Sequence, residues 1–420
     1  MKFLNGELNI TSRSMRKNPR ILHYYNEIVR FLNKLNFIIK RTLPNSLKPN
    51  TRQLAYCLYV TYRIFWEKAS IKTIFKEVKE VNKGFLKNLR QFSWEKALQN
   101  KNNKEKLSIC EAVPSFMIDQ LLPVMSQKFI KDNIRVMNGA VGGDRTTVRI
   151  NRLLERKFGD NLDLMIKSEF ERENIPFTKD SHVEDLLTIP SSMKKNVLKS
   201  SIYQKGYLIN QDKASAAVVQ ALSPQSGELI CDMCAAPGIK TSLIAQKMKN
   251  QGQIIAGEFL NKRIKIMKQL LNQLNVLNTF ILNIDSIVFP LRFENMFDRV
   301  LLDAPCTGSG TFLTNPELKW RQNKRFLHQN TILQKKLFQS ALKMLKTGGI
   351  LVYSTCSLYP QEGEHIIIDF LNQLQPQILP AWFSPSYMIN NSELPGIGRL
   401  FPSVHQTQGF FIGKFKKKEI

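Results

Sequence analysis

Two cysteines that each follow a predicted buried strand are the residues of this chain best placed to do covalent chemistry. Cys306 ends the run RVLLDAPC, which begins at Arg299, and Cys356 ends the run GILVYSTC, which begins at Gly349. The carboxyl ends of parallel strands are where α/β sheets bind ligands. Two thiols at such ends, one preceded by the carboxylate of Asp303, predict covalent chemistry on an electron-poor ring.

The elements that position these cysteines are strands alternating with amphipathic helices, a pattern that starts at about residue 206 and is typical of a mostly parallel sheet. We expect strands over residues 229–232, 253–256, 280–283, 299–303 and 350–353. We expect helices from Lys240, over 263–274 and over 333–345. The cysteines then follow the fourth and fifth strands, at one edge of the sheet.

Acidic residues at the ends of neighbouring strands predict a site for a nucleoside cofactor. The turn from Ala235 to Gly238 lets backbone N–H groups approach a ligand, beside the N-terminus of the next helix. Glu258 is placed to accept hydrogen bonds from two ribose hydroxyls, and Asp285 to accept one from an adenine amino group. The sequence argues against an ATP-binding loop, because Ile239 and Met233 stand where that loop needs glycine, and the turn does not supply the G-x-G-x-x-G of a dinucleotide site.

The charge of the chain predicts a polyanionic partner. It carries 61 Lys and Arg against 34 Asp and Glu, a net charge of +27, with 43% hydrophobic residues. Nucleic acid is the usual partner of such a folded, basic protein, although a solvated basic surface has the same composition. The apolar stretch at 55–66 is shorter than the ~20 residues of a membrane span, and residues 1–6 lack the apolar core of a signal peptide.

Cysteine usage indicates a reducing compartment, so we expect a cytoplasmic protein. Six cysteines in 420 residues do not form a disulfide framework. Cys231 and Cys234 form a C-x-x-C, but no second pair or histidine cluster completes a zinc site, and we expect no metal.

The first third of the chain is predicted to be helical. Apolar residues recur at helical spacing from Ile21 to Ile38, then over 54–65 and 74–81, and a further helix is expected over 114–125. A polar break is expected at 100–106, and a short mixed segment follows, with a strand at 146–151 and a helix at 162–173. Lysines and arginines interleave with the apolar stripes, as on an RNA-binding face or a solvated one.

Six segments between residues 146 and 415 occur together in an order typical of one enzyme family. They are QDKAS at 211–215, DMCAAPGIKT at 232–241, DAPCTGSG at 303–310, NPE at 315–317, YSTCS at 353–357 and GFFI at 409–412. With them the chain resembles the Sun/Fmu family of S-adenosylmethionine-dependent RNA cytosine-5 methyltransferases. The pattern departs from the family at Ile239, where a second glycine is usual, and at Gln361–Glu364, where a Glu-Asn-Glu run is usual.

The resemblance implies three domains. Residues 206–417 would form a Rossmann-like α/β methyltransferase domain, 136–205 a small α/β RNA-recognition-like subdomain, and 1–135 an all-α domain similar to the NusB-like RNA-binding extension of ribosomal small-subunit members. The implied partner is RNA, with ribosomal RNA favoured over transfer RNA. We expect no membrane association and no obligate protein partner, and a monomer by default.

The resemblance also assigns roles to individual residues. Cys356 would be the nucleophile that bonds C6 of cytosine, Cys306 the cysteine needed for release, and Asp303 a contact to the target base, expected in its protonated form near N3. The S-adenosylmethionine site would be lined by Ala235, Ala236, Pro237, Gly238, Ile239, Lys240, Glu258, Arg263, Asp285 and Asp303.

Three alternatives are weighed against this assignment. A non-catalytic RNA-binding ribosome-assembly factor on a methyltransferase scaffold would not need Asp303, Cys306 and Cys356 together. A DNA cytosine methyltransferase would take its nucleophile from the Pro-Cys turn, whereas this chain has the additional Thr355-Cys356. Amino-group methyltransferases carry an Asp/Asn-Pro-Pro-aromatic turn that is absent from the fourth strand end.

Overall fold

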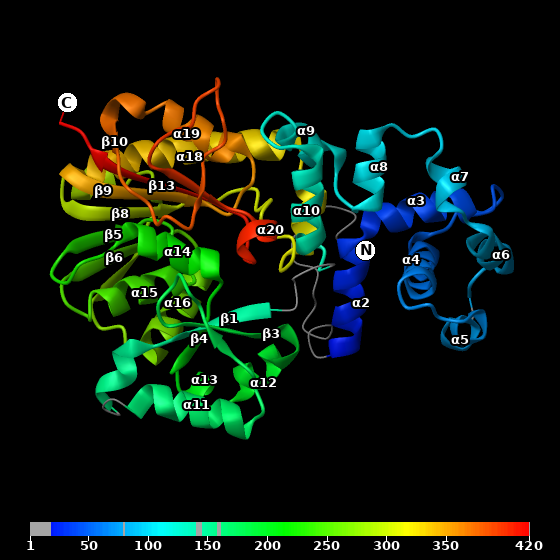
Figure 1. Cartoon of the computed structure of the whole chain (residues 1–420), viewed down its shortest axis with the longest axis horizontal. Coiled ribbons are helices and arrows are strands. Elements are labelled where there is room, and N and C mark those ends of the chain that lie inside the picture. Colours follow the sequence, from blue (N-terminus) through cyan, green and yellow to red (C-terminus); the bar gives the residue numbers. More distant parts are fainter. Residues whose placement is uncertain (1–17, 79, 140–144, 158–160, 420) are drawn as a thin grey trace. The chain divides into compact units, whose positions relative to one another are not determined.

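The computed structural model describes residues 18–78, 80–139, 145–157 and 161–419 (Figure 1). Its contacts divide the chain into two compact units. One comprises Met1–Asp119 and Thr314–Gln322, and the other comprises Gln120–Leu313 and Asn323–Ile420. Residues 1–6, expected to lack a signal-peptide core, lie outside the described residues, as do 140–144 and 158–160 of the segment assigned to the small subdomain.

The first unit is helical, which confirms that part of the predicted fold class. Its helices are α2 (Pro19–Arg30), α3 (Leu32–Thr42), α4 (Thr51–Phe65), α5 (Ile71–Glu77), α6 (Lys83–Gln91), α7 (Trp94–Leu98) and α8 (Asn103–Cys110). The periodic run from Ile21 to Ile38 is two helices rather than one, because Phe31 (φ −110°, ψ 19°) leaves the helical conformation. The expected polar break contains the start of α8, where Asn102 and Glu105 form a capping box that the apolar pattern does not register.

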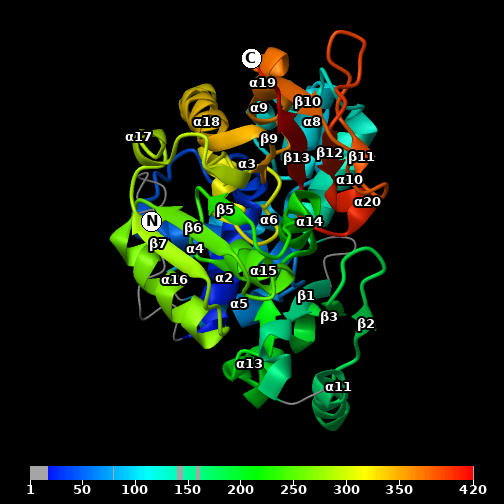
Figure 2. The same cartoon turned by 90° about the vertical axis from the view of Figure 1, so that its left-hand side faces the viewer.

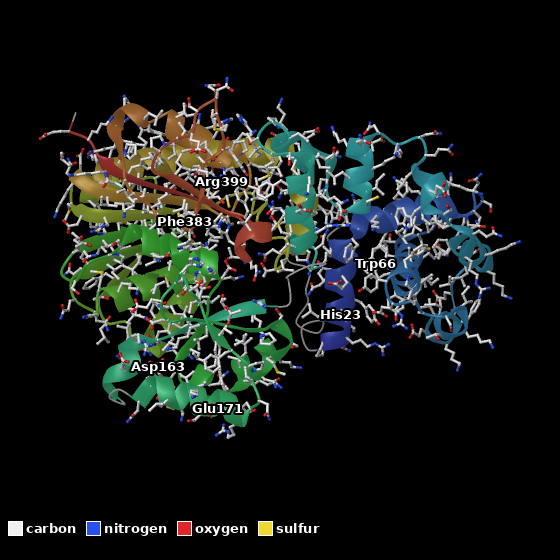
Figure 3. The ribbon with its side chains drawn as sticks, in the orientation of Figure 1. His23, Trp66, Asp163, Glu171, Phe383 and Arg399 are labelled. Atoms are coloured by element: carbon white, nitrogen blue, oxygen red, sulfur yellow. The ribbon has the colours of Figure 1, made fainter. Side chains whose placement is uncertain are left out.

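The segment Thr314–Gln322 contributes to the core of this helical unit. Its short helix η5 (Pro316–Arg321) buries Lys319, whose ammonium donates to the carbonyls of Arg30 (3.0 Å) and Ala112 (3.2 Å). The indole of Trp320 donates to the carbonyl of Val29 at 2.6 Å. Trp66, labelled in Figure 3, is partly buried and packs against the hydrophobic core of this unit.

The second unit contains a small α/β subdomain with an antiparallel four-stranded sheet. The strands are β1 (Arg145–Ile150), β2 (Thr178–Lys179), β3 (Leu186–Pro190) and β4 (Leu208–Asn210), in the order β2-β3-β1-β4. Helix α11 (Leu162–Arg172) packs its buried side chains against them. Arg149 of β1 is fully buried, and donates to Gln246 Oε1 (2.9 Å) and Ser242 Oγ (2.7 Å) of helix α15 (Ile239–Lys247).

A larger sheet carries the remaining strands, in the order β11-β12-β13-β9-β8-β5-β6-β7. Its parallel part consists of β5 (Leu229–Asp232), β6 (Gln253–Glu258), β7 (Thr279–Asn283), β8 (Phe297–Asp303) and β9 (Leu345–Thr355). Strands β11 (Ser384–Pro385), β12 (Ile397–Leu400) and β13 (Phe410–Lys417) extend it in antiparallel pairing, and β10 (Leu374–Pro376) pairs with β13.

Helices cover both faces of this sheet, as the Rossmann-like prediction requires. In Figure 1, α14 (Lys213–Leu222), α15 and α16 (Asn261–Gln273) lie below the sheet, and α18 (Lys324–Met344) and α19 (Glu364–Ile368) lie above it. Figure 2 shows β5, β6 and β7 side by side. Helix α18 begins earlier than predicted, because Asn323 caps it by accepting from Phe326 N at 2.9 Å. Among the described residues, no helix is long and apolar enough to cross a membrane.

Candidate active site

The residues expected to do chemistry meet at the carboxyl edge of the parallel strands. Asp232 ends β5, Glu258 ends β6 and Asp303 ends β8, and Cys356 directly follows β9. Strands β8 and β9 are adjacent, and Asp303 pairs in register with Ser354. The sheet therefore brings both predicted cysteine turns to neighbouring strand ends.

The two cysteines are in direct contact. Their Sγ atoms lie 3.2 Å apart, and both side chains are partly exposed. The hydrogen bond with Cys356, burial and the charge of Glu362 raise the pKa of Cys306 well above its ordinary value. Cys306 is thus held as a thiol, whose proton can be shared with the Cys356 sulfur.

Lys240 and Asp303 form an ion pair beside the thiols. Lys240 Nζ lies 2.7 Å from Asp303 Oδ2, and the Ser354 hydroxyl donates to Asp303 Oδ1 at 2.7 Å. Burial acts against the charge of Lys240, but Asp303 and then Cys356 outweigh it, so its pKa is raised. Both oxygens of Asp303 accept hydrogen bonds, as a carboxylate does, and the charge of Lys240 interacts with the predicted nucleophile.

Asp232 supports the turn that follows β5. It is 1% exposed and accepts from Thr241 Oγ1 at 2.7 Å. Burial raises the pKa of Asp232 to about 7, since the Thr241 hydrogen bond only partly offsets it. The hydrogen bond ties the strand end to the first turn of α15.

The turn from Ala235 to Gly238 is shaped to admit a ligand against its backbone. Ala235 N donates to Gly257 O at 3.0 Å, and Gly238 N donates to Ala235 O at 2.8 Å. Gly238 has a φ of +100°, and a Cβ there would lie 3.0 Å from Met267 Cγ. Ile239, the departure from the family pattern, is the first residue of α15. Glycine is therefore required at 238, whereas 239 accepts a branched side chain.

Glu258 and Arg263, two residues expected at the cofactor site, form an ion pair. Arg263 Nη1 lies 2.9 Å from Glu258 Oε2, and Glu258 Oε1 accepts from Leu260 N at 2.8 Å. Arg263 also donates to the carbonyl of Ala236. Asp285 is exposed, and its Oδ1 accepts from Ile287 N at 3.0 Å. Small residues, a left-handed glycine and strand-end carboxylates together fit a nucleoside cofactor.

Two glycines from distant motifs, Gly310 and Gly409, hydrogen-bond to each other through their backbones, and Gly310 also bonds to Cys356. Gly310 N donates to Cys356 O at 3.0 Å, and Gly409 N donates to Gly310 O at 2.9 Å. A Cβ on Gly310 would lie 2.1 Å from Gly409 O. The close approach of these backbones explains why both motifs contain glycine.

The acidic residues that follow Cys356 had no role predicted from the sequence. Glu362 is fully buried and bonds to Thr307, next to Cys306. Glu364 forms a fully buried ion pair with Arg399, which is labelled in Figure 3 and donates to Ser357 O at 2.9 Å. The sequence carried one sign of a role for Glu362 and Glu364, which is their position six and eight residues after a strand-end cysteine. Carboxylates are seldom buried in apolar surroundings without a partner.

Gly363 is a departure from the family pattern that the structure explains. A Cβ at this position would lie 2.4 Å from Phe411 Cδ2 and 2.8 Å from Arg399 Nη2, and both of these side chains are fully buried. Asparagine, usual in the family run, would need this packing to change.

The C-x-x-C pair lies in the same strand end but faces the core. Cys231 is fully buried, and burial raises its pKa well above the ordinary value. Burial likewise raises the pKa of Cys234. Within the described part of the chain, no group of three or more His, Cys, Asp or Glu residues could hold a metal ion.

Comparison with known proteins links this site to RNA methylation. A family model described as 16S rRNA methyltransferase RsmB/F matches residues 219–416. A tRNA (cytosine(49)-C(5))-methyltransferase of Pyrococcus abyssi is 35% identical over 288 residues, which cover 65% of this chain and 88% of that protein. A 28S rRNA (cytosine-C(5))-methyltransferase of Mus musculus is 38% identical over 227 residues, 51% of this chain and 28% of that protein.

A solved structure shares the architecture. A methyltransferase homologue from Pyrococcus horikoshii superposes with a TM-score of 0.63 and 28% sequence identity, covering 76% of this chain and 99% of that one. The chain thus spans less than a third of the mouse relative and most of the Pyrococcus abyssi relative.

Proposed function

Because the chain belongs to the RsmB/F (Sun/Fmu) family of S-adenosylmethionine-dependent RNA cytosine-5 methyltransferases, we propose that it methylates C5 of a cytosine in RNA through a covalent bond between Cys356 and C6. The observation that carries the proposal is the contact of Cys306 and Cys356, 3.2 Å apart, beside the Lys240–Asp303 ion pair. A non-catalytic RNA-binding factor would not need these four groups assembled at one strand edge.

The first step is addition of the Cys356 thiolate to C6. Cytosine C5 is too weak a nucleophile to attack a methyl group unaided, and a sulfur–C6 bond converts the ring into an enamine-like species. The ammonium of Lys240 interacts with the charge of Cys356 and favours the thiolate. Asp303 already accepts hydrogen bonds from Lys240 and Ser354. We therefore assign the hydrogen bond to N3 of the ring to the proton that Lys240 and Asp303 hold between them.

Bound S-adenosylmethionine supplies an electrophilic methyl group to C5. Glu258 would accept from the ribose hydroxyls, Asp285 from the adenine amino group, and the turn over Ala235, Ala236, Pro237 and Gly238 would approach the ligand with its backbone. Arg263 orients Glu258, and Ile239 and Lys240 begin the helix alongside.

Release requires loss of the C5 proton, after which the electrons of the C5–H bond form the C5–C6 double bond and the Cys356–C6 bond breaks. Cys306 is the candidate base, directly or through water. To accept that proton, Cys306 must first have released its own thiol proton to water, and its raised pKa then makes the thiolate a strong base. The enzyme can reach the cytosine ring only if the cytosine is unstacked from its neighbours in the RNA.

Ribosomal RNA is the substrate class we favour, with transfer RNA next. The family model and the mouse relative are named for ribosomal RNA, whereas the Pyrococcus abyssi relative is named for tRNA. The net charge of +27 suits either polyanion. RNA binding by residues 1–135, their NusB-like character, a cytoplasmic location and a monomeric state remain predictions. Bisulfite sequencing of RNA from a deletion strain would identify the cytosine.

The proposal is tested by transfer of a labelled methyl group to RNA in the wild type and in two variants. Cys356→Ala should abolish methylation and trapping by 5-fluorocytosine RNA. Cys306→Ala should instead accumulate a protein–RNA adduct on unmodified RNA, visible on a denaturing gel. Wild-type turnover in both variants would refute the assignment.

A further inference from the structure

Glu362 holds an unusual position, since it bonds to chain segments on both sides of the two cysteines. It lies in the short helix η6 (Pro360–Glu362) after β9 and is fully buried. Among the described residues, no lysine or arginine forms an ion pair with its carboxylate, and burial raises its pKa. A buried carboxylate without a cation is costly to fold, so its hydrogen bonds must supply the compensation.

On the Cys306 side, the carboxylate fixes the residues before and after the cysteine. Glu362 Oε1 accepts from Thr307 N at 2.9 Å, and Oε2 accepts from the Thr307 hydroxyl. Gln334 Nε2 donates to Glu362 Oε1 at 3.0 Å and to Pro305 O at 2.8 Å. Both neighbours of Cys306 in the chain are therefore attached to Glu362, one directly and one through Gln334.

On the Cys356 side, the same residue fixes the neighbours of the other cysteine. The Glu362 carbonyl accepts from Thr355 Oγ1 at 3.1 Å and from the Tyr353 hydroxyl at 2.9 Å. Thr355 directly precedes Cys356, so Glu362 joins the two cysteine turns into one bonded unit.

We propose that Glu362 is a positioning residue that holds the Cys306 and Cys356 turns in the relative placement needed for ordered addition and release. This inference rests on the proposed function, because it assigns the two turns to successive steps of one reaction. Glu362 is fully buried and would act through the backbone from which both thiols project. A displacement of about 1 Å in such a site costs roughly 100-fold in rate.

The network can be cut on either side separately. Gln334→Leu removes the link to Pro305 and leaves the Cys356 side intact, so release should slow and the adduct should persist on unmodified RNA. Tyr353→Phe removes a hydroxyl from the Cys356 side, so adduct formation on 5-fluorocytosine RNA should slow. Glu362→Gln keeps the shape but removes the charge and one acceptor, and should slow both steps about 10- to 100-fold.

The matched control is Glu169→Gln on α11. Glu169 is also a buried carboxylate, paired with Arg172, but it lies in the small α/β subdomain. Its variant should keep wild-type formation and release rates. The Kd of S-adenosylmethionine, measured by calorimetry, and the KM for RNA should stay within about twofold of wild type in all four variants, because the four side chains are buried within the protein.

The outcomes separate this inference from the proposed function. If the wild type forms no adduct with 5-fluorocytosine RNA, the proposed function fails. If the wild type forms the adduct and Glu362→Gln matches it in both steps, only the positioning role is refuted. The role is likewise refuted if Gln334→Leu and Tyr353→Phe slow the same step equally, or if the Glu362→Gln rate loss comes with an equal loss of cofactor affinity.

Discussion

Replacing Lys240 with methionine should slow formation of the covalent adduct more than it weakens cofactor binding. The change removes the cation that interacts with Cys356 and leaves Asp303, 2.7 Å from the lost ammonium, as an uncompensated carboxylate beside the thiol. As an upper bound, a unit charge about 4 Å from the thiolate would be worth about 4 kcal/mol at an effective dielectric constant of about 20.

Partial exposure of the Lys240 and Asp303 side chains, 15% and 26%, reduces that value. We therefore expect a barrier higher by about 2–3 kcal/mol, or a rate about 30- to 150-fold lower. Lys240→Arg, which keeps the charge, should lose less.

The assay is single-turnover trapping by 5-fluorocytosine RNA at saturating S-adenosylmethionine, over a range of pH. Because the pKa of Lys240 is raised, its ammonium stays charged over the neutral range. Without the cation, the pH of half-maximal trapping should move upward. A Lys240→Met variant that traps RNA within about threefold of the wild-type rate, at unchanged pH dependence, would refute this reasoning.

Three further changes have defined outcomes. The pKa of Asp232 is about 7 in the folded protein against 3.8 for the free group, so protonation of Asp232 contributes stability that is fully present below pH 3.8 and is lost as the pH rises through 7. In Asp232→Asn, the free energy of unfolding measured by denaturant titration should therefore depend less on pH between these two values. Gly310→Ala places a Cβ 2.1 Å from Gly409 O, and we expect it to lower the free energy of unfolding by about 3 kcal/mol; a wild-type melting temperature would contradict this close approach. Glu258→Gln should weaken S-adenosylmethionine binding about 10- to 100-fold by calorimetry, and an unchanged Kd would remove Glu258 from the cofactor site.

The strand edge that holds the site could be predicted from the sequence because each reactive residue follows an apolar strand directly. Asp303, Cys306 and Cys356 lie at strand ends where the pattern placed them. The contacts between those ends could not be predicted, since they depend on which strands are neighbours. Lys240, taken as a residue of the cofactor turn, reaches across to Asp303 because β5 and β8 are adjacent.

Buried residues that hold the site in place could not be predicted from the sequence pattern. The sequence around Glu362 predicts an ordinary loop carboxylate, because its hydrogen bond with Gln334, on a helix 28 positions away, leaves no signal in the local pattern. Helix starts were missed where capping side chains set them, as at Asn102 and Asn323, because apolar periodicity carries no signal from polar caps. Arg149 was missed for a related reason, since an arginine in a strand predicts solvent rather than a buried contact with α15.

The central claim is that Cys356, and not Cys306, bonds the cytosine ring. The wild-type protein trapped on 5-fluorocytosine RNA should be digested with protease and nuclease, and the cross-linked peptide sequenced by tandem mass spectrometry. The account predicts a nucleotide attached at Cys356. Attachment at Cys306, or no covalent product under conditions that support methyl transfer, would contradict it.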